Sequence, residues 1–288
     1  MLSYLTPLVA LLPLALACPD HSDPTFHGLV RRQVDSPDTG NGNWTTRVSG
    51  SSIWAYEASY NWGRLNPDYE LCQTGTQQSP IALRRSDATN HARTPRFTGY
   101  RGTWAGQYFN WGYGSAFNLD HPENDYTTLP SMLVGNQTLY MTGWHIHAPA
   151  DHQIDGDRSK AELHFVHVDA EGHEKAVLGF LLDPLMNHSG ENSTFLDQLP
   201  SPLLHYNETD KQLAMEMSFD SALTEVNNFE EHWTYQGSLT SPPCHEGIRW
   251  FVAKQRLMTS NAQMQEILRV STFSARSIQE EWLHQVNL

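Results

Sequence analysis

The spacing of apolar residues in the middle of the chain predicts β-strands. Three runs, TLYMTGWHIHA, AELHFVHVD and KAVLGFLLD, are short, apolar or alternating, and bounded by Gly, Pro, Asp or Asn. Such runs between turn-forming residues are typical of strands. The turn-rich segment DGDRS separates the first two runs, and SLTSPPC with GIRWFVAKQ forms a second strand-rich cluster near residue 245.

Helical signals are few. The best is AQMQEILRVS, in which Met264, Ile267 and Leu268 have helical spacing. From Ile53 onward the chain shows no internal repeat and no second change in composition. We therefore expect a single domain over residues 51–288 with an α+β, mainly β fold: a large, twisted, mostly antiparallel central sheet with short peripheral helices.

The N-terminus has the pattern of a secretory signal peptide. Residues 1–17 form an apolar run that ends in Ala15-Leu16-Ala17, as at a signal-peptidase site, although no Lys or Arg precedes the run. The run is too short to span a membrane and contains prolines. Because the C-terminus EEWLHQVNL is polar and shows no lipid-anchor tail, we expect a secreted, extracellular protein without a membrane anchor.

Residues 18–50 are rich in Ser, Asp, Gly, Pro and Asn, which predicts a flexible leader that includes a candidate pro-segment. Arg31-Arg32 is either a dibasic processing site or an ordinary exposed pair, and both interpretations stay open. Cys18 lies at the expected cleavage point. If Cys18 leaves with the pro-segment, Cys72 and Cys244 remain to form one disulfide in an oxidising compartment.

Composition and charge narrow the class of protein. The 288 residues include nine Trp, eleven Tyr and eleven Phe, which indicates a packed globular protein rather than a disordered one. The net charge is −14 and no long basic run exists, so we expect no nucleic-acid partner. Five N-glycosylation motifs behind a signal peptide predict a glycoprotein; they lie at Asn43, Asn136, Asn187, Asn192 and Asn207.

Two of the predicted strands carry histidines in a pattern that suits a metal. Residues i and i+2 of a strand share a face, so His145 and His147 project together, as do Glu162 and His164, whereas His167 lies on the other face. If the strands are neighbours, three imidazoles converge at one point. Three neutral imidazoles and an open fourth position suit catalytic Zn2+ better than copper or iron, since no Cys or Met ligand lies nearby.

The alternative for any single histidine is an ordinary hydrogen-bonded residue. That interpretation applies to the isolated ones, which are His121, His173, His188, His205 and His284. An H-x-H pair by itself would favour a metal site only slightly. The second strand, with its E-L-H-x-V-H pattern, is what favours a metal centre.

These motifs resemble the α-class carbonic anhydrases. WHIHAPADHQIDGDRSKAELHFVH is similar to the zinc-binding core of that family, and the resemblance extends from WAYE through NWGRLNPDYELCQTGTQQSPI, GSAFNLD and KAVLGFLL to YQGSLTSPPCHEGIRWFVAKQ. It implies a secreted, glycosylated member that catalyses the reversible hydration of CO2 to bicarbonate and a proton by zinc-bound hydroxide. It also implies weak esterase side activity, inhibition by sulfonamides or anions at zinc, and a monomer or homodimer.

The resemblance assigns roles to individual residues. His145, His147 and His164 correspond to the zinc ligands, and Thr240 to the threonine that orients the attacking hydroxide. Asp151 stands where the family has a glutamate that accepts the threonine proton, one methylene shorter. Glu162 corresponds to the carboxylate that holds His164, as is common for metal-bound histidines.

Further positions follow from the same comparison. His152 and Tyr235 are interpreted as hydrogen-bonding residues near the site, and Gly143 replaces a frequent glutamine that supports the first ligand. Cys72 and Cys244 stand where secreted members have their disulfide. The apolar CO2 wall corresponds to positions that are equally interpretable as core: Val166, Val177, Leu239, Ile248 and Trp250.

The largest departure is at the proton-shuttle position. Fast family members have His in GHAFN, whereas this chain has Ser115 in GSAFN, and serine does not titrate near pH 7. We therefore expect a slower enzyme or a substitute group, for which Tyr56, Tyr113 and His121 are candidates that the sequence does not rank.

Two other functions are alternatives to CO2 hydration. A catalytically silent, carbonic-anhydrase-like binding domain is the main alternative, but silent members typically lose a zinc ligand and this chain keeps all three histidines. A zinc ester or peptide hydrolase is less consistent, because the chain has no H-E-x-x-H motif.

Overall fold

The computed structural model describes residues 54–185 and 192–288, all of which belong to one unit of the chain, residues 31–288. The predicted signal peptide and leader, Cys18, Arg31-Arg32, Asn43, Asn187 and His188 lie outside the described residues. None of the helices in the described ranges is long and apolar enough to cross a membrane.

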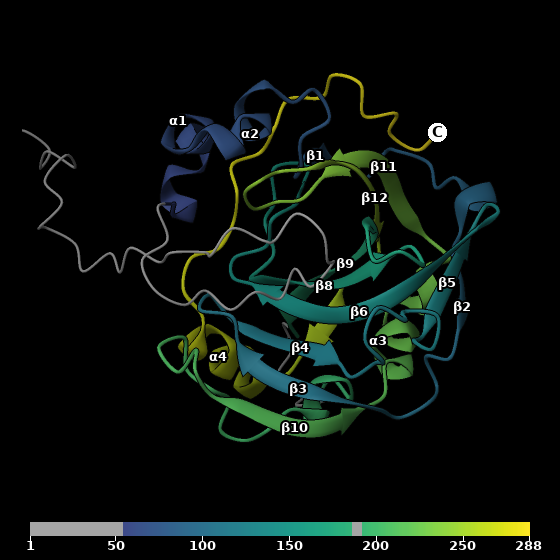
Figure 1. Cartoon of the computed structure of the whole chain (residues 1–288), viewed down its shortest axis with the longest axis vertical. Coiled ribbons are helices and arrows are strands. Elements are labelled where there is room, and N and C mark those ends of the chain that lie inside the picture. The colour runs from purple at the N-terminus through teal and green to yellow at the C-terminus, as the bar shows by residue number, and fades with distance from the viewer. Residues whose placement is uncertain (1–53, 186–191) are drawn as a thin grey trace, which may run out of the picture. The chain divides into compact units, whose positions relative to one another are not determined.

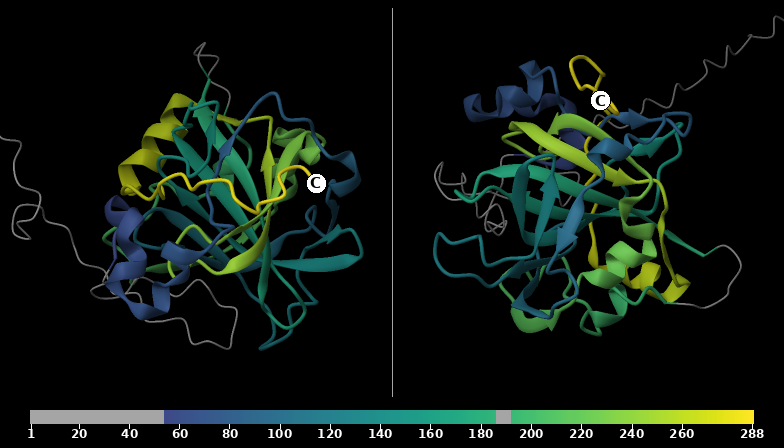
Figure 2. Two further views of the ribbon diagram at one scale, coloured as in Figure 1. Left: turned by 90° about the horizontal axis from the view of Figure 1, so that it is seen from above. Right: turned by 90° about the vertical axis from the view of Figure 1, so that its right-hand side faces the viewer.

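A twisted sheet of eleven strands organises the domain (Figures 1 and 2). Its main path runs β10-β3-β4-β6-β8-β9-β12-β11, with β13 on β9, β5 on β6 and β2 on β5. The strands are β2 (Arg96–Thr98), β3 (Trp104–Asn110), β4 (Ser115–Leu119), β5 (Ser131–Val134), β6 (Gln137–His147), β8 (Ala161–Val168), β9 (Glu174–Pro184), β10 (Gln212–Met217), β11 (His232–Ser238), β12 (Glu246–Ala253) and β13 (Leu257–Thr259). Strands β1 (Ala82–Leu83) and β7 (Gln153–Ile154) form a separate parallel pair.

Most strand pairs in the large sheet are antiparallel; only β12 and β13 run parallel to β9. The expected α+β, mainly β fold with a large mostly antiparallel sheet is therefore confirmed. The three apolar runs of the sequence form β6, β8 and β9, which are consecutive in the sheet. Every residue of β8 is buried, as befits a strand covered on both faces.

Side-chain alternation along β6 and β8 separates two environments. Trp144 and Ile146 of β6 join Leu163 and Phe165 of β8 in the largest apolar core, on one side of the sheet. The intervening positions, including Val166, face a second apolar cluster. The histidines at the intervening positions therefore share the face of this second cluster, because successive strand residues point to opposite sides.

The helices are short and peripheral. They are α1 (Trp62–Leu65), α2 (Leu71–Thr74), α3 (Asp220–Glu225) and α4 (Asn261–Val270), with 3-10 turns at Tyr56–Asn61, Pro67–Tyr69, His91–Arg93, Leu196–Gln198 and Asn227–Phe229. In α4 a capping box at the N-terminus pairs Ser260 with Gln263. The helix predicted from the spacing of Met264, Ile267 and Leu268 is confirmed. Met264 and Ile267 are buried, whereas Leu268 is 42% exposed and Val270 completes the buried face.

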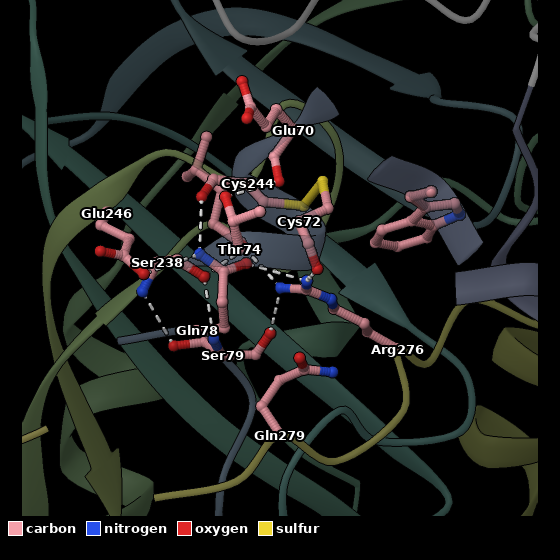
Figure 3. The surroundings of a disulfide bond; sticks show 12 residues. Glu70, Cys72, Thr74, Gln78, Ser79, Ser238, Cys244, Glu246, Arg276 and Gln279 are labelled. Atoms are coloured by element: carbon pink, nitrogen blue, oxygen red, sulfur yellow. Dashed lines mark hydrogen bonds between the residues drawn. A yellow bond between two sulfur atoms is a disulfide. The ribbon is translucent and has the colours of Figure 1, made fainter. Parts of the chain in front are cut away.

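The segment before β1 is anchored by the only disulfide in the described residues. Cys72 of α2 is bonded to Cys244, which confirms the expected pair, and the sequence separation is 172 residues. Both cysteines pack in a small aromatic cluster with Trp54, Tyr56, Trp62, Tyr69 and Tyr113. The disulfide thereby joins the N-terminal helices to the loop that follows β11 (Figure 3).

Candidate metal centre and active site

Three imidazoles meet where β6 lies beside β8. The antiparallel register places His145 opposite His164 and His147 opposite Glu162. The ring centroids of the three histidines are 4.6, 4.8 and 5.1 Å apart. One nitrogen from each ring lies within 4.8 Å of the other two, and all three side chains are buried. The sheet thus brings together the three histidines that the sequence selected.

The protonation states of these rings suit a cation. Burial lowers the pKa of His145 well below its usual value, and it also lowers the pKa of His147, so both rings are neutral at pH 7. His147 Nδ1 donates to the Ser274 carbonyl at 2.6 Å, which leaves a lone pair on Nε2. The buried imidazole of His164 reaches the same point, so a metal is the fitting occupant, because imidazole nitrogen is a good ligand for zinc.

Glu162 and His152 form a buried network beside His164. His152 Nδ1 lies 2.7 Å from Glu162 Oε1, and the His152 backbone N–H donates to Oε2 at 2.8 Å. His152 Nε2 lies 2.7 Å from the Tyr235 hydroxyl, which donates to Ser79 Oγ at 3.0 Å. His152 and Tyr235 are therefore hydrogen-bonding residues near the site, as predicted.

The carboxylate of Glu162 also approaches the third histidine. His164 Nε2 lies 3.0 Å from Glu162 Oε1, close enough for an ion-pair contact but off the direction of an ordinary hydrogen bond. Burial alone would raise the pKa of Glu162, but His152 and His164 outweigh burial and hold the pKa well below its usual range. A charged carboxylate at this position stabilises the His164 ring in one orientation.

Asp151 is fully buried on the other side of the histidine cluster. Its Oδ1 accepts from the Arg276 backbone N–H at 2.8 Å, whereas Oδ2 lies 3.6 Å from His147 Nδ1 and has no hydrogen-bond partner. Thr240, in the loop after β11, is 6% exposed, and within the described ranges no hydrogen bond joins its hydroxyl to Asp151. The shorter aspartate therefore leaves one buried carboxylate oxygen available as an acceptor.

The five predicted wall residues belong to one apolar cluster. Val166, Val177, Ile248 and Trp250 are at most 2% exposed, and Leu239 packs against them. The Trp250 ring centroid lies 4.9 Å from that of His164. These side chains are core residues close to the histidine centre. That they also line a CO2 pocket stays a prediction.

The shuttle position does not face the histidines. Ser115 is 1% exposed and its hydroxyl lies 2.9 Å from the Tyr108 hydroxyl, inside the core below β4. Among the substitutes, Tyr56 is beside His147 with ring centroids 5.8 Å apart, but burial raises its pKa well above the usual value. Tyr113 is buried against Trp54, and His121 lies beyond the end of β4, with its ring against Tyr126.

Gly143 stands where a side chain cannot fit. A Cβ there would lie 2.3 Å from the Phe117 carbonyl oxygen and 3.1 Å from Asn118 Oδ1. Close approach of β4 to β6 thus accounts for the absence of a glutamine that would support His145.

Three residues of the site carried no signal in the sequence. Trp111 lies against both H-x-H histidines, at 5.3 Å between ring centroids in each case. Ser274 contacts His147 through its backbone carbonyl, and Arg276 contacts Asp151 through its backbone N–H. Each contact joins residues more than a hundred positions apart in the sequence. No local motif marks such contacts. Of the glycosylation motifs in the described ranges, Asn136, Asn192 and Asn207 are all exposed.

Comparisons with known proteins agree with this geometry. Residues 57–286 match the family model of eukaryotic-type carbonic anhydrase. The carbonic anhydrase of Pectobacterium carotovorum is 29% identical over 230 residues, which cover 79% of this chain and 86% of that protein. The structure of α-carbonic anhydrase from Thermovibrio ammonificans with the inhibitor sulfanilamide is similar with a TM-score of 0.66 and 25% identity, over 81% of this chain and 96% of that one.

A protein with a different name is also similar. Dioscorin dioA3 of Dioscorea japonica is 26% identical over 205 residues, 71% of this chain and 70% of that protein. The large mixed sheet and the three-histidine centre define a protein of the α-carbonic anhydrase type. The chain belongs to the eukaryotic-type carbonic anhydrase family.

Proposed function

We propose that this protein is a secreted zinc enzyme that catalyses the reversible hydration of CO2 to bicarbonate and a proton. The observation that carries the proposal is the convergence of three buried imidazoles from β6 and β8 with no thiolate among them. His145, His147 and His164 would hold the metal. When bound, zinc lowers the pKa of a water ligand to about 7, the value established for carbonic anhydrase, and so supplies the nucleophile at neutral pH.

The residues around the centre have complementary tasks. The Ser274 carbonyl fixes the tautomer of His147, and Glu162 holds the His164 ring. The apolar cluster of Leu239 and Trp250 with its neighbours offers an uncharged substrate a mainly apolar surface. Thr240 would orient the nucleophile by accepting a hydrogen bond from it. Asp151 Oδ2, which has no hydrogen-bond partner, would accept a hydrogen bond from the Thr240 hydroxyl.

A stopped-flow CO2 hydration assay on zinc-loaded protein tests the proposal, with and without sulfanilamide. We expect turnover that the sulfonamide suppresses, because a relative of known structure binds this inhibitor. Thr240→Ala should lower kcat/KM about 100-fold at unchanged zinc content, since misorientation of a nucleophile costs that order of rate. An inactive, folded, zinc-loaded sample would reject the proposal. Slow hydrolysis of an activated ester in the same samples would test the weak esterase activity.

Secretion and glycosylation are part of the same proposal. They are supported by the N-terminal signal-peptide pattern, by a disulfide that needs an oxidising compartment, and by three exposed glycosylation motifs. Expression in a eukaryotic secretory host, followed by enzymatic removal of N-glycans, should give a downward mass shift in the medium fraction. Sedimentation of that material would decide between monomer and homodimer.

A catalytically silent binding domain is the second candidate, favoured by the similarity to dioscorin dioA3. The intact set of three histidines argues against it, because a binding domain has no need of a metal-coordinating geometry. The hydration assay separates the two.

A further inference from the structure

Arg276 is completely buried and lies beside the disulfide bond (Figure 3). Its two terminal nitrogens donate to four acceptors, which are Ser79 O at 2.7 Å, Leu239 O at 3.4 Å, Cys72 O at 3.1 Å and Gln78 Oε1 at 2.8 Å. The guanidinium carbon lies 5.3 Å from the Trp62 ring centroid. The planar guanidinium of Arg276 is thereby fixed by acceptors on several segments of the chain.

The same residue also reaches Asp151 through its main chain. The Arg276 backbone N–H donates to Asp151 Oδ1 at 2.8 Å, which fixes one oxygen of the carboxylate and turns the other toward the site. Burial lowers the pKa of Arg276 to about 10, against the opposing charge of Asp151, so the side chain remains a cation at neutral pH. A buried cation with this many acceptors is a rigid anchor, because each lost contact leaves charge uncompensated.

Two acceptors of Arg276 are connected to the loop that carries Thr240. Leu239 immediately precedes Thr240, and Cys72 is bonded to Cys244, four residues after Thr240. One side chain therefore ties the loop that carries Thr240, while its own backbone ties the carboxylate of Asp151. We propose that Arg276 is a positioning residue that sets the placement of Thr240 relative to Asp151 during CO2 hydration.

This inference rests on the proposed function, and its test begins with the wild-type enzyme. Arg276→Lys keeps the charge but loses the fork, so it cannot hold both Leu239 and Cys72. We expect kcat to fall at least tenfold while KM changes less than twofold and zinc content stays at the wild-type level. Arg269→Lys is the matched control, since Arg269 is half exposed and pairs with Glu266 on α4; its kcat should match the wild type.

A double-mutant cycle separates positioning from general loss of stability. If Arg276 acts through Thr240, adding Arg276→Lys to Thr240→Ala should lower kcat less than twofold further. If the two substitutions lower kcat independently, so that their factors multiply in the double variant, the inference is overturned. If Arg276→Lys does not fold, Gln78→Ala removes one acceptor and leaves Arg276 in place. A kcat loss of threefold or more with the same non-additivity is then expected, and unchanged kcat or multiplying losses would overturn the inference.

The outcomes for the two proposals are distinguishable. A zinc-loaded wild-type protein without CO2 hydration rejects the proposed function itself. An active wild type whose Arg276→Lys variant keeps kcat rejects only the positioning role.

Discussion

His145 Nε2 and His147 Nε2 lie 2.9 Å apart. Two neutral imidazole nitrogens at this distance either share a proton or direct their lone pairs to a common cation. His147 donates its Nδ1 proton to Ser274, so its Nε2 is an acceptor, and His164 approaches the same point. The strand register therefore brings three imidazole nitrogens to one point, and metal binding there is measurable independently of catalysis.

Zinc should stabilise the folded protein in a way that depends on this cluster. A ligand that binds only the native state raises the melting temperature as its concentration exceeds the dissociation constant. We expect zinc to raise the Tm of the metal-free wild type and to leave that of His164→Ala nearly unchanged in calorimetry. His173→Ala serves as control, since that side chain is 67% exposed. A zinc-dependent Tm in His164→Ala equal to the wild type would refute the ligand assignment.

The disulfide should contribute strongly to stability. Cys72 and Cys244 close a loop with a sequence separation of 172 residues, and in the chain-entropy model such a cross-link stabilises by on the order of 5 kcal/mol. We expect the double variant Cys72→Ser with Cys244→Ser to unfold at a clearly lower denaturant concentration. Its kcat should fall as well, because the bond braces the loop of Thr240. Cys18→Ser is the control, and equal midpoints for all three proteins would contradict the prediction.

The sequence predicts the central strands of the sheet better than the short helices at its periphery. The alternation in β6 and β8 selected His145, His147 and His164, because the strand period fixes which side chains share a face. The single-turn helices α1 and α2 gave no periodic signal, since they are too short and depend on tertiary packing against the disulfide.

Contacts between distant segments were not predictable. The Arg276 backbone N–H donates a hydrogen bond to Asp151, 125 residues earlier in the sequence. The residues around either position give no sequence signal of this contact. Ser115 was correctly singled out as unable to titrate, but its inward direction follows only from packing against Tyr108.

Proton transfer to solvent should limit turnover. Two residues near the expected shuttle position are poor proton carriers: the Ser115 hydroxyl contacts that of Tyr108, and burial raises the pKa of Tyr56 well above its usual value. We expect imidazole buffer to raise kcat several-fold with kcat/KM nearly constant, because proton release follows the hydration step. Ser115→His should not reproduce the effect and should lower stability, since it overpacks the core. A kcat independent of imidazole concentration would show that another group carries the proton.

His167 should make the fold sensitive to acid. It is fully buried, its Nδ1 lies 3.2 Å from the Phe165 carbonyl, and its Nε2 contacts the Tyr100 hydroxyl. Burial lowers its pKa to about 3, against about 6.5 in the unfolded chain. Between these values the unfolded state binds the extra proton, so the stabilisation is complete above about pH 6.5. It is lost at up to about 1.4 kcal/mol per pH unit as the pH falls toward 3.

The variant His167→Gln keeps a donor and an acceptor but does not titrate. We expect it to be less stable than wild type at pH 8 and to have a shallower fall of unfolding free energy between pH 6.5 and 4. Urea titrations of metal-free protein measure this, because loss of zinc in acid then makes no contribution. His173→Gln is the matched control, since His173 is exposed beside Asp169, and its slope should equal that of the wild type. A slope in His167→Gln as steep as in the wild type would mean that other buried histidines, such as His232, account for the acid sensitivity.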